Sequence, residues 1–171
     1  MHRDSETSKD YAPPPPYVSA APPAVLFPQF AKEVFNLSTS AKLPLNGFTY
    51  GNRIRVLLQP LVNYDGRFAI NLRNGDGDIL LHFNPRLKER VVVFNTHNNG
   101  KWQYEERLSF LFPFERLRVY TIDLSSSGRN SVIIYLNGQF LFEFRQRQFP
   151  FKSASAVEVS GDVSIHSIHI A

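Results

Sequence analysis

The chain of 171 residues contains no cysteine and only one tryptophan, and it has no long run of apolar residues. Without thiols it can form neither a disulfide, nor a thiolate nucleophile, nor a thiolate metal site. Residues 1–10, MHRDSETSKD, lack the apolar core of a signal peptide, and no stretch approaches the ~18 apolar residues of a membrane span. We therefore expect synthesis in the cytosol and no insertion into a membrane.

Charge of one sign is not concentrated anywhere in the sequence. The 19 basic residues and 15 acidic residues give a formal net charge of +4, and the two kinds are interleaved rather than gathered into blocks. A protein that binds nucleic acid usually gathers its basic residues into a patch or a stripe. The charge pattern therefore argues against a nucleic-acid partner.

Glycine is absent from residues 1–28, whereas proline is abundant there, with Pro13–Pro16 in a row. Proline interrupts helices and sheet ladders, so this segment is predicted to be a disordered, polyproline-II-like tail. Residues 29–171 are left as one folded domain, which is what a chain of this length accommodates. Residues 14–17, Pro-Pro-Pro-Tyr, fit a short motif for aromatic-lined grooves, although a plain spacer has the same composition.

The sequence pattern of the predicted domain is that of an all-β protein. Apolar residues alternate with polar ones, as at Ile54, Val56 and Leu58, and no segment has a convincing period of 3.6 residues. Turn dipeptides separate these runs at short intervals. They stand at 46–47, 65–66, 74–75, 99–100, 127–128, 137–138 and 160–161. Two packed antiparallel sheets, a jelly-roll-like sandwich, would let every strand bury one face.

The most informative predicted strand covers residues 78–86, DILLHFNPR. Because side chains alternate along a strand, His82, Asn84 and Arg86 are predicted on one face with Leu80, and Ile79, Leu81 and Phe83 on the other. Pro85 has no backbone N–H, which favours an edge strand or the start of a turn here. A polar face that only meets water would not need three such directional hydrogen-bonding groups.

The following segments add a compatible set of side chains. Asn95 ends the next predicted strand, Trp102 follows the turn at 98–100, and Glu105 and Arg107 share a face, with Glu106 opposite. A pyranose offers an apolar C–H face that stacks on an indole and hydroxyls that pair with amides and charged groups. The combination predicts a sugar site, although a lone tryptophan is more often part of a core.

These residues also resemble the signature of the galectins in order and spacing. The matching strings are His82-Phe83-Asn84-Pro85-Arg86, Val93-Phe94-Asn95, Trp102 with Glu105-Glu106-Arg107, and Phe112-Pro113-Phe114. The resemblance covers residues 30–171 and implies a β-galactoside site on the concave face of a two-sheet sandwich. It implies no cofactor and no metal.

By position, the resemblance implies a role for each site residue. His82, Asn84 and Arg86 would bind the axial 4-hydroxyl of galactose, and Trp102 would stack under the ring. Asn95 and Glu105 would bind the 6-hydroxyl. Glu105, Arg86 and Arg107 would bind the 3-hydroxyl of the adjoining glucose or N-acetylglucosamine. Before sugar binds, Arg86 is expected to be exposed.

Beyond galactose, an extended subsite is predicted from Arg67, Asn71 and Arg90. Many galectins have a histidine or an asparagine near the sugar where this chain has Arg90. The substitution would favour anionic galactosides if Arg90 reaches the sugar, and would have no effect on binding if it faces solvent.

The sequence argues against an enzyme. Glycosidases need two opposed carboxyl groups, whereas Glu105 and Glu106 are neighbours that point to opposite faces. A galectin-like module for protein–protein contacts, with altered or lost sugar specificity, remains the alternative to a lectin. Homodimerisation and self-association through the tail both stay open as routes to multivalency. Because galectins leave the cell without a signal peptide, the resemblance implies both cytoplasmic and extracellular locations.

Overall fold

The computed structural model describes residues 30–62, 65–128 and 130–171. The predicted tail, residues 1–28, lies outside the described residues, as does residue 29. No helix of the described residues is long and apolar enough to cross a membrane.

The described part of the chain contains thirteen β-strands and one turn of 3₁₀ helix (η1, Phe151–Ser153). The strands are β1 (Lys32–Leu37), β2 (Ala41–Pro44), β3 (Arg53–Pro60), β4 (Phe68–Asn74), β5 (Ile79–Arg86), β6 (Val91–Asn98), β7 (Lys101–Trp102), β8 (Glu106–Leu108), β9 (Tyr120–Ser127), β10 (Ser131–Leu136), β11 (Gln139–Arg145), β12 (Ala154–Gly161) and β13 (Val163–Ile170).

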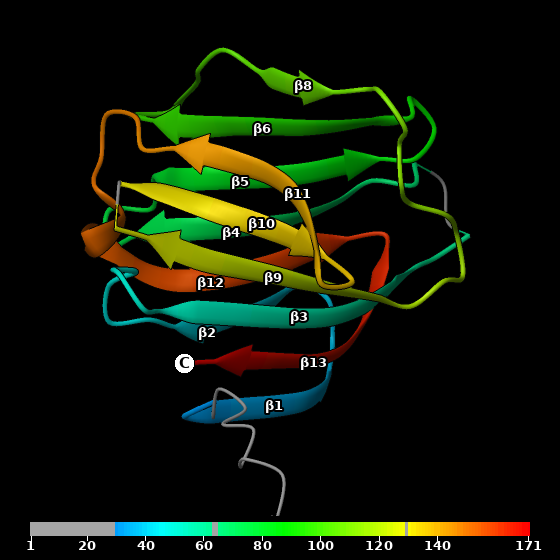
Figure 1. The fold of residues 1–171 in the computed structure, drawn as a ribbon, viewed down its shortest axis with the longest axis horizontal. Coiled ribbons are helices and arrows are strands. Elements are labelled where there is room, and N and C mark those ends of the chain that lie inside the picture. Colours follow the sequence, from blue (N-terminus) through cyan, green and yellow to red (C-terminus); the bar gives the residue numbers. More distant parts are fainter. Residues whose placement is uncertain (1–29, 63–64, 129) are drawn as a thin grey trace, which may run out of the picture.

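The strands form two antiparallel sheets that pack face to face (Figure 1). One has six strands in the order β1-β13-β3-β9-β10-β11. The other has seven, in the order β2-β12-β4-β5-β6-β7, with β8 also paired to β6. The prediction of an all-β sandwich of two antiparallel sheets is confirmed.

The core lies between the sheets and follows the alternation seen in the sequence. On β3, Ile54, Val56 and Leu58 are fully buried while the residues between them are partly exposed. Phenylalanines fill the centre, where the ring of Phe94 stacks on that of Phe142 with 4.0 Å between centroids. The inner face of every central strand is thereby removed from water, which is the main stabilising contribution to such a sandwich.

The predicted faces of β5 are wrong at its first two residues. Leu80, not Ile79, belongs to the apolar core cluster, together with Leu81 and Phe83. The pairing of β5 with both β4 and β6 shifts register within residues 79–82, and such a bulge changes the phase of the alternation. From His82 onward the predicted alternation holds.

β5 is an interior strand, so Pro85 does not mark a sheet edge. The continuous ladder between β4 and β5 ends at the pair Ile70–Phe83, and only an isolated bridge between Arg67 and Arg86 lies beyond it. Pro85 therefore lies beyond the β4–β5 ladder, one residue before the strand ends in a turn, and its missing N–H interrupts no hydrogen bond of that ladder.

Candidate functional site

A groove of about 470 Å³ lies on the seven-stranded sheet, over β5, β6 and β7. It brings together most of the predicted site residues and adds others. Its lining consists of Arg67, His82, Asn84, Arg86, Val93, Asn95, Trp102, Gln103 and Glu105. Arg107 joins this set through its ion pair with Glu105. The seven predicted residues of the main site therefore form one continuous surface.

Asn84 orients Arg86 within the groove. The side-chain amide of Asn84 donates to the carbonyl oxygen of Phe68 at 2.8 Å, which fixes the direction of its Oδ1. That oxygen accepts a hydrogen bond from Arg86 Nε, also at 2.8 Å. Arg86 is held in place before any ligand arrives, because both partners are already paired.

Arg86 also belongs to a chain of alternating charges. Its Nη2 donates to Glu105 Oε1 at 3.0 Å, and Arg107 Nε donates to Glu105 Oε2 at 2.8 Å. On its other side, Glu89 pairs with Arg86 and with Arg67. These contacts leave the Arg86 side chain only 15% exposed, so the expectation that it is exposed without sugar is wrong.

Glu105 stays ionised in this setting. Burial raises the pKa of Glu105, but the hydrogen bonds and charges of Arg107 and Arg86 outweigh it and lower that pKa below its ordinary value. A carboxylate that holds no proton near neutral pH accepts hydrogen bonds and cannot serve as a general acid.

His82 is neutral for a different reason. Burial, assisted by the positive charge of Arg86, lowers the pKa of His82 to about 4. Its Nδ1 lies 2.7 Å from Asn71 Oδ1, which can only accept, so the single proton of the neutral ring is on Nδ1. The Nε2 atom is therefore left as a hydrogen-bond acceptor.

Trp102 forms an aromatic platform at the end of the groove. Its indole is 52% exposed, although aromatic residues of this size are usually mostly buried. The ring centroids of His82 and His97 lie 4.7 and 4.9 Å from that of Trp102. The two imidazoles support the indole, while much of its surface stays open to solvent.

Asn95 is buried on β6 and held on both sides of its amide. Its Nδ2 donates to the carbonyl oxygen of Gln103 at 3.0 Å. Its Oδ1 accepts from Thr96 N at 2.8 Å and from Arg147 Nη1 at 3.1 Å. The amide can therefore present to the groove only the second hydrogen of Nδ2, as a donor.

Comparison with known proteins identifies the family to which this chain belongs. Residues 37–170 match the sequence profile of the galactoside-binding lectins. This chain is a member of that family. A lectin binds its carbohydrate without chemical change, so the prediction that the chain is not an enzyme is confirmed.

The relatives of this lectin include both curated sequences and solved structures. It is 35% identical to galectin-4 of Sus scrofa over 138 residues, which are 80% of this chain but 42% of that protein. It is 38% identical to galectin-7 of Rattus norvegicus over 61% of this chain and 77% of that protein. The crystal structure of the Caenorhabditis elegans galectin LEC-6 is similar, with a TM-score of 0.75 and 37% identity over 85% of this chain and 99% of that one. The lectin thus spans less than half the length of the galectin-4 relative.

The three residues of the predicted extended subsite lie in different surroundings. Arg67 lines the groove of the lectin next to Glu89. Asn71 is buried behind His82, which it orients. Arg90 lies outside the groove lining, with its guanidinium 5.7 Å from the ring centroid of Phe112. Arg67 alone of the three is thus placed to meet a ligand directly.

Three residues of the site were missed by sequence reasoning. Glu89 connects Arg67 with Arg86, and its place three residues after Arg86 was a signal that was not used. Gln103 holds Asn95 through a backbone carbonyl, which any residue type provides. Arg147 is 52 positions from Asn95 and lies on the loop after β11, so no local pattern points to it.

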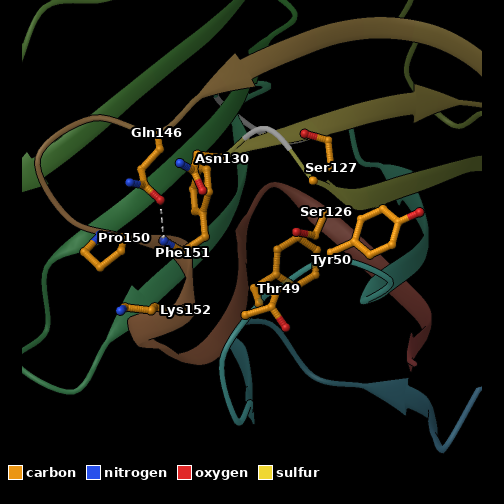
Figure 2. A pocket seen from close by; sticks show the side chains of 11 residues that line it. Thr49, Tyr50, Ser126, Ser127, Asn130, Gln146, Pro150, Phe151 and Lys152 are labelled. Carbon is orange, nitrogen blue, oxygen red and sulfur yellow. Dashed lines mark hydrogen bonds between the residues drawn. The ribbon is translucent and has the colours of Figure 1, made fainter.

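A second cavity, of about 370 Å³, lies at one end of the sandwich (Figure 2). It is formed by the loops after β2, β9 and β11, and Lys152 is the single charged side chain in its described lining. Gln146 Oε1 within it accepts from the backbone N–H of Phe151 at 3.1 Å. No group of three or more metal-binding side chains occurs among the described residues of this lectin.

Proposed function

We propose that this chain binds β-galactosides, such as lactose and N-acetyllactosamine, in the groove over β5, β6 and β7. Membership of the galactoside-binding lectins supports the ligand class. The observation that carries the proposal is the half-exposed indole of Trp102 beside the row of His82, Asn84 and Arg86. An apolar plate next to directional polar groups matches the two chemically different faces of galactose.

In the proposed complex, Trp102 lies under the C–H face of galactose, and the axial 4-hydroxyl points toward β5. This hydroxyl donates to Nε2 of neutral His82 and accepts from the guanidinium of Arg86. Asn84 contributes by fixing Arg86 and by lining the same end of the groove. A hydroxyl is both donor and acceptor, so one group satisfies both partners.

The remaining polar residues serve the 6-hydroxyl and the second sugar. The spare Nδ2 hydrogen of Asn95 and the carboxylate of Glu105 bind the 6-hydroxyl of galactose. Arg86, Glu105 and Arg107 bind the 3-hydroxyl of glucose or N-acetylglucosamine. Charge-assisted hydrogen bonds of this kind are stronger than neutral ones, and the paired charges need no rearrangement.

Selectivity follows from groups that lose their partner when the wrong sugar is bound. With glucose in place of galactose, the equatorial 4-hydroxyl points away from His82 and Arg86. Leaving a desolvated donor or acceptor unpaired costs about 1–3 kcal/mol for each group. Galactosides are therefore preferred over glucosides by a factor that calorimetry detects.

The test is calorimetric titration of lactose into the wild-type chain and into the Trp102→Ala variant, with sucrose as the control ligand. Stacking on an aromatic ring contributes about 1.5–2 kcal/mol, so the variant loses affinity about 10–30-fold. Its melting temperature stays unchanged, because the indole is half exposed. The control variant Tyr50→Ala removes an exposed aromatic ring at the other cavity and keeps full affinity.

Lactose affinity that is the same in Trp102→Ala as in the wild type would refute the proposed site. A wild-type chain that binds no galactoside would instead favour the alternative, a galectin-like module for protein–protein contacts, whose partner binding would survive the loss of Trp102. Multivalency through dimers, tail-mediated association, and both cytoplasmic and extracellular locations stay predictions.

A further inference from the structure

Arg147 connects the two sheets at the sugar groove. It lies on the loop after β11, a strand of the six-stranded sheet, whereas the groove lies on the seven-stranded sheet. Its side chain crosses to β6 and to the segment that carries Trp102 and Glu105, and it is only 12% exposed. A residue of this kind can affect ligand binding without touching the ligand.

The guanidinium of Arg147 makes an unusually complete set of contacts. Its Nη1 donates to Asn95 Oδ1 at 3.1 Å, to the carbonyl oxygen of Tyr104 at 2.9 Å and to Thr96 Oγ1 at 3.3 Å. Its Nη2 donates to Glu106 Oε2 at 2.8 Å. The guanidinium carbon lies 3.9 Å from the ring centroid of Tyr104. One planar cation thus joins β6 to both residues that flank Glu105.

The contact with Arg147 helps to fix the orientation of the Asn95 side-chain amide. Arg147 and the N–H of Thr96 both donate to Oδ1, so a flipped amide would set its NH₂ group against two donors. The Nδ2 end therefore faces Gln103 and the groove at all times. A ligand hydroxyl meets a donor at this position and never an acceptor.

For Glu105, the consequence is a fixed direction. Side chains of neighbouring residues in an extended segment point to opposite sides, so the anchoring of Glu106 by Arg147 turns Glu105 toward the groove. The bond from Arg147 to the carbonyl of Tyr104 holds the preceding residue as well. The ion pairs with Arg86 and Arg107 then fix the position of the Glu105 carboxylate.

The arrangement comes with an electrostatic cost that argues for a specific role. The Nε atom of Arg147 is buried and has no hydrogen-bond partner among the described residues. Leaving a buried donor unpaired is unfavourable, and native structures do so rarely. A lysine would relieve this cost, but its ammonium group has only three N–H donors and cannot bind all four acceptors.

We propose that Arg147 is a positioning residue that orients Asn95 and Glu105 toward the 6-hydroxyl of galactose. It thereby sets the preference of the groove for galactosides that carry this hydroxyl over their 6-deoxy analogues. This inference rests on the proposed function and adds to it a determinant that lies outside the groove.

The experiment compares lactose with 6′-deoxylactose by calorimetry in the wild type and in the variants Arg147→Met and Arg147→Lys. The wild type prefers lactose about tenfold, because the hydroxyl meets a preplaced donor and a charged acceptor. Both variants lose most of this preference: lactose affinity falls about tenfold, while affinity for 6′-deoxylactose changes less than about twofold. Arg145→Met, an exposed arginine two residues earlier, behaves as the wild type.

The ratio of the two affinities separates positioning from general stability. A merely structural role would weaken both ligands in parallel or lower only the melting temperature, and either outcome would overturn the inference. If Arg147→Met does not fold, Arg147→Lys and Glu106→Gln test the same ratio with smaller changes of volume. A wild type that binds neither ligand overturns the proposed function itself, whereas binding with an unchanged ratio overturns only the role of Arg147.

Discussion

The protonation of His82 gives the sharpest quantitative prediction for the groove. Because the pKa of His82 is lowered from 6.5 to about 4, the ring is about 90% neutral at pH 5. An unperturbed histidine would be only about 3% neutral at that pH. If neutral Nε2 accepts the galactose 4-hydroxyl, lactose affinity at pH 5 stays close to its value at pH 7.5. With an ordinary histidine it would fall about thirtyfold.

The assay is calorimetric titration of lactose at steps between pH 7.5 and pH 4.5. Calorimetry is preferable to fluorescence here, since it measures binding without relying on the indole of Trp102, against which both His82 and His97 pack. A His97→Gln variant is the control, and its lactose affinity should change with pH by the same factor as that of the wild type. Affinity that falls with a midpoint near pH 6.5 would show that His82 is not held neutral by its surroundings.

Folding stability has to be followed in the same experiment. The unfolded chain takes up a proton on His82 below pH 6.5, whereas the folded chain does so only near pH 4. This contribution to stability is therefore complete above pH 6.5 and declines as the pH falls toward 4, by about 2 kcal/mol at pH 5. Thermal melts at each pH establish that the protein is still folded when its affinity is measured.

Two further predictions concern stability away from the groove. Gly161→Ala places a Cβ 2.4 Å from the carbonyl oxygen of Arg67 at a backbone φ of +101°, so it lowers the free energy of unfolding by more than about 2 kcal/mol in urea melts. Gly75→Ala is the control, since no atom lies near its Cβ, and it changes this free energy little. Equal effects of the two substitutions would contradict the steric argument. Asp123→Asn removes the charge that pairs with Arg53 and Arg55 at 2.8 Å each, and it lowers the free energy of unfolding by about 3 kcal/mol. Lactose affinity is retained, because Asp123 is on β9 of the other sheet. A variant as stable as the wild type, or one that no longer binds lactose, would be inconsistent with this role.

The part of the fold that depends on side-chain alternation was predictable from the sequence. The buried faces of β3 and β10 follow directly from the apolar pattern, because a strand that buries one face must alternate. The same rule gave the wrong faces for Ile79 and Leu80, since a bulge is a property of the pairing of strands and leaves no clear mark on one strand alone.

The site was predictable where its residues follow one another on a strand or a turn. His82, Asn84 and Arg86 alternate on β5, and their shared face follows from that spacing. Contacts across the sandwich were not predictable in the same way. Arg147 contacts Asn95 from the loop after β11, a strand of the other sheet, because the tertiary fold brings together residues far apart in the chain.

The pairing of the first strand with the last has a consequence for biosynthesis. β1 pairs with β13, Lys32 opposite Ile170 and Leu37 opposite Ile165, so the strand made first gains its neighbour only when nearly all other strands exist. Contacts between such distant residues close large loops and slow folding. On the ribosome, at about 5–20 residues per second, β1 therefore stays unpaired for about 7–27 s. The six-stranded sheet is completed only after translation of β13.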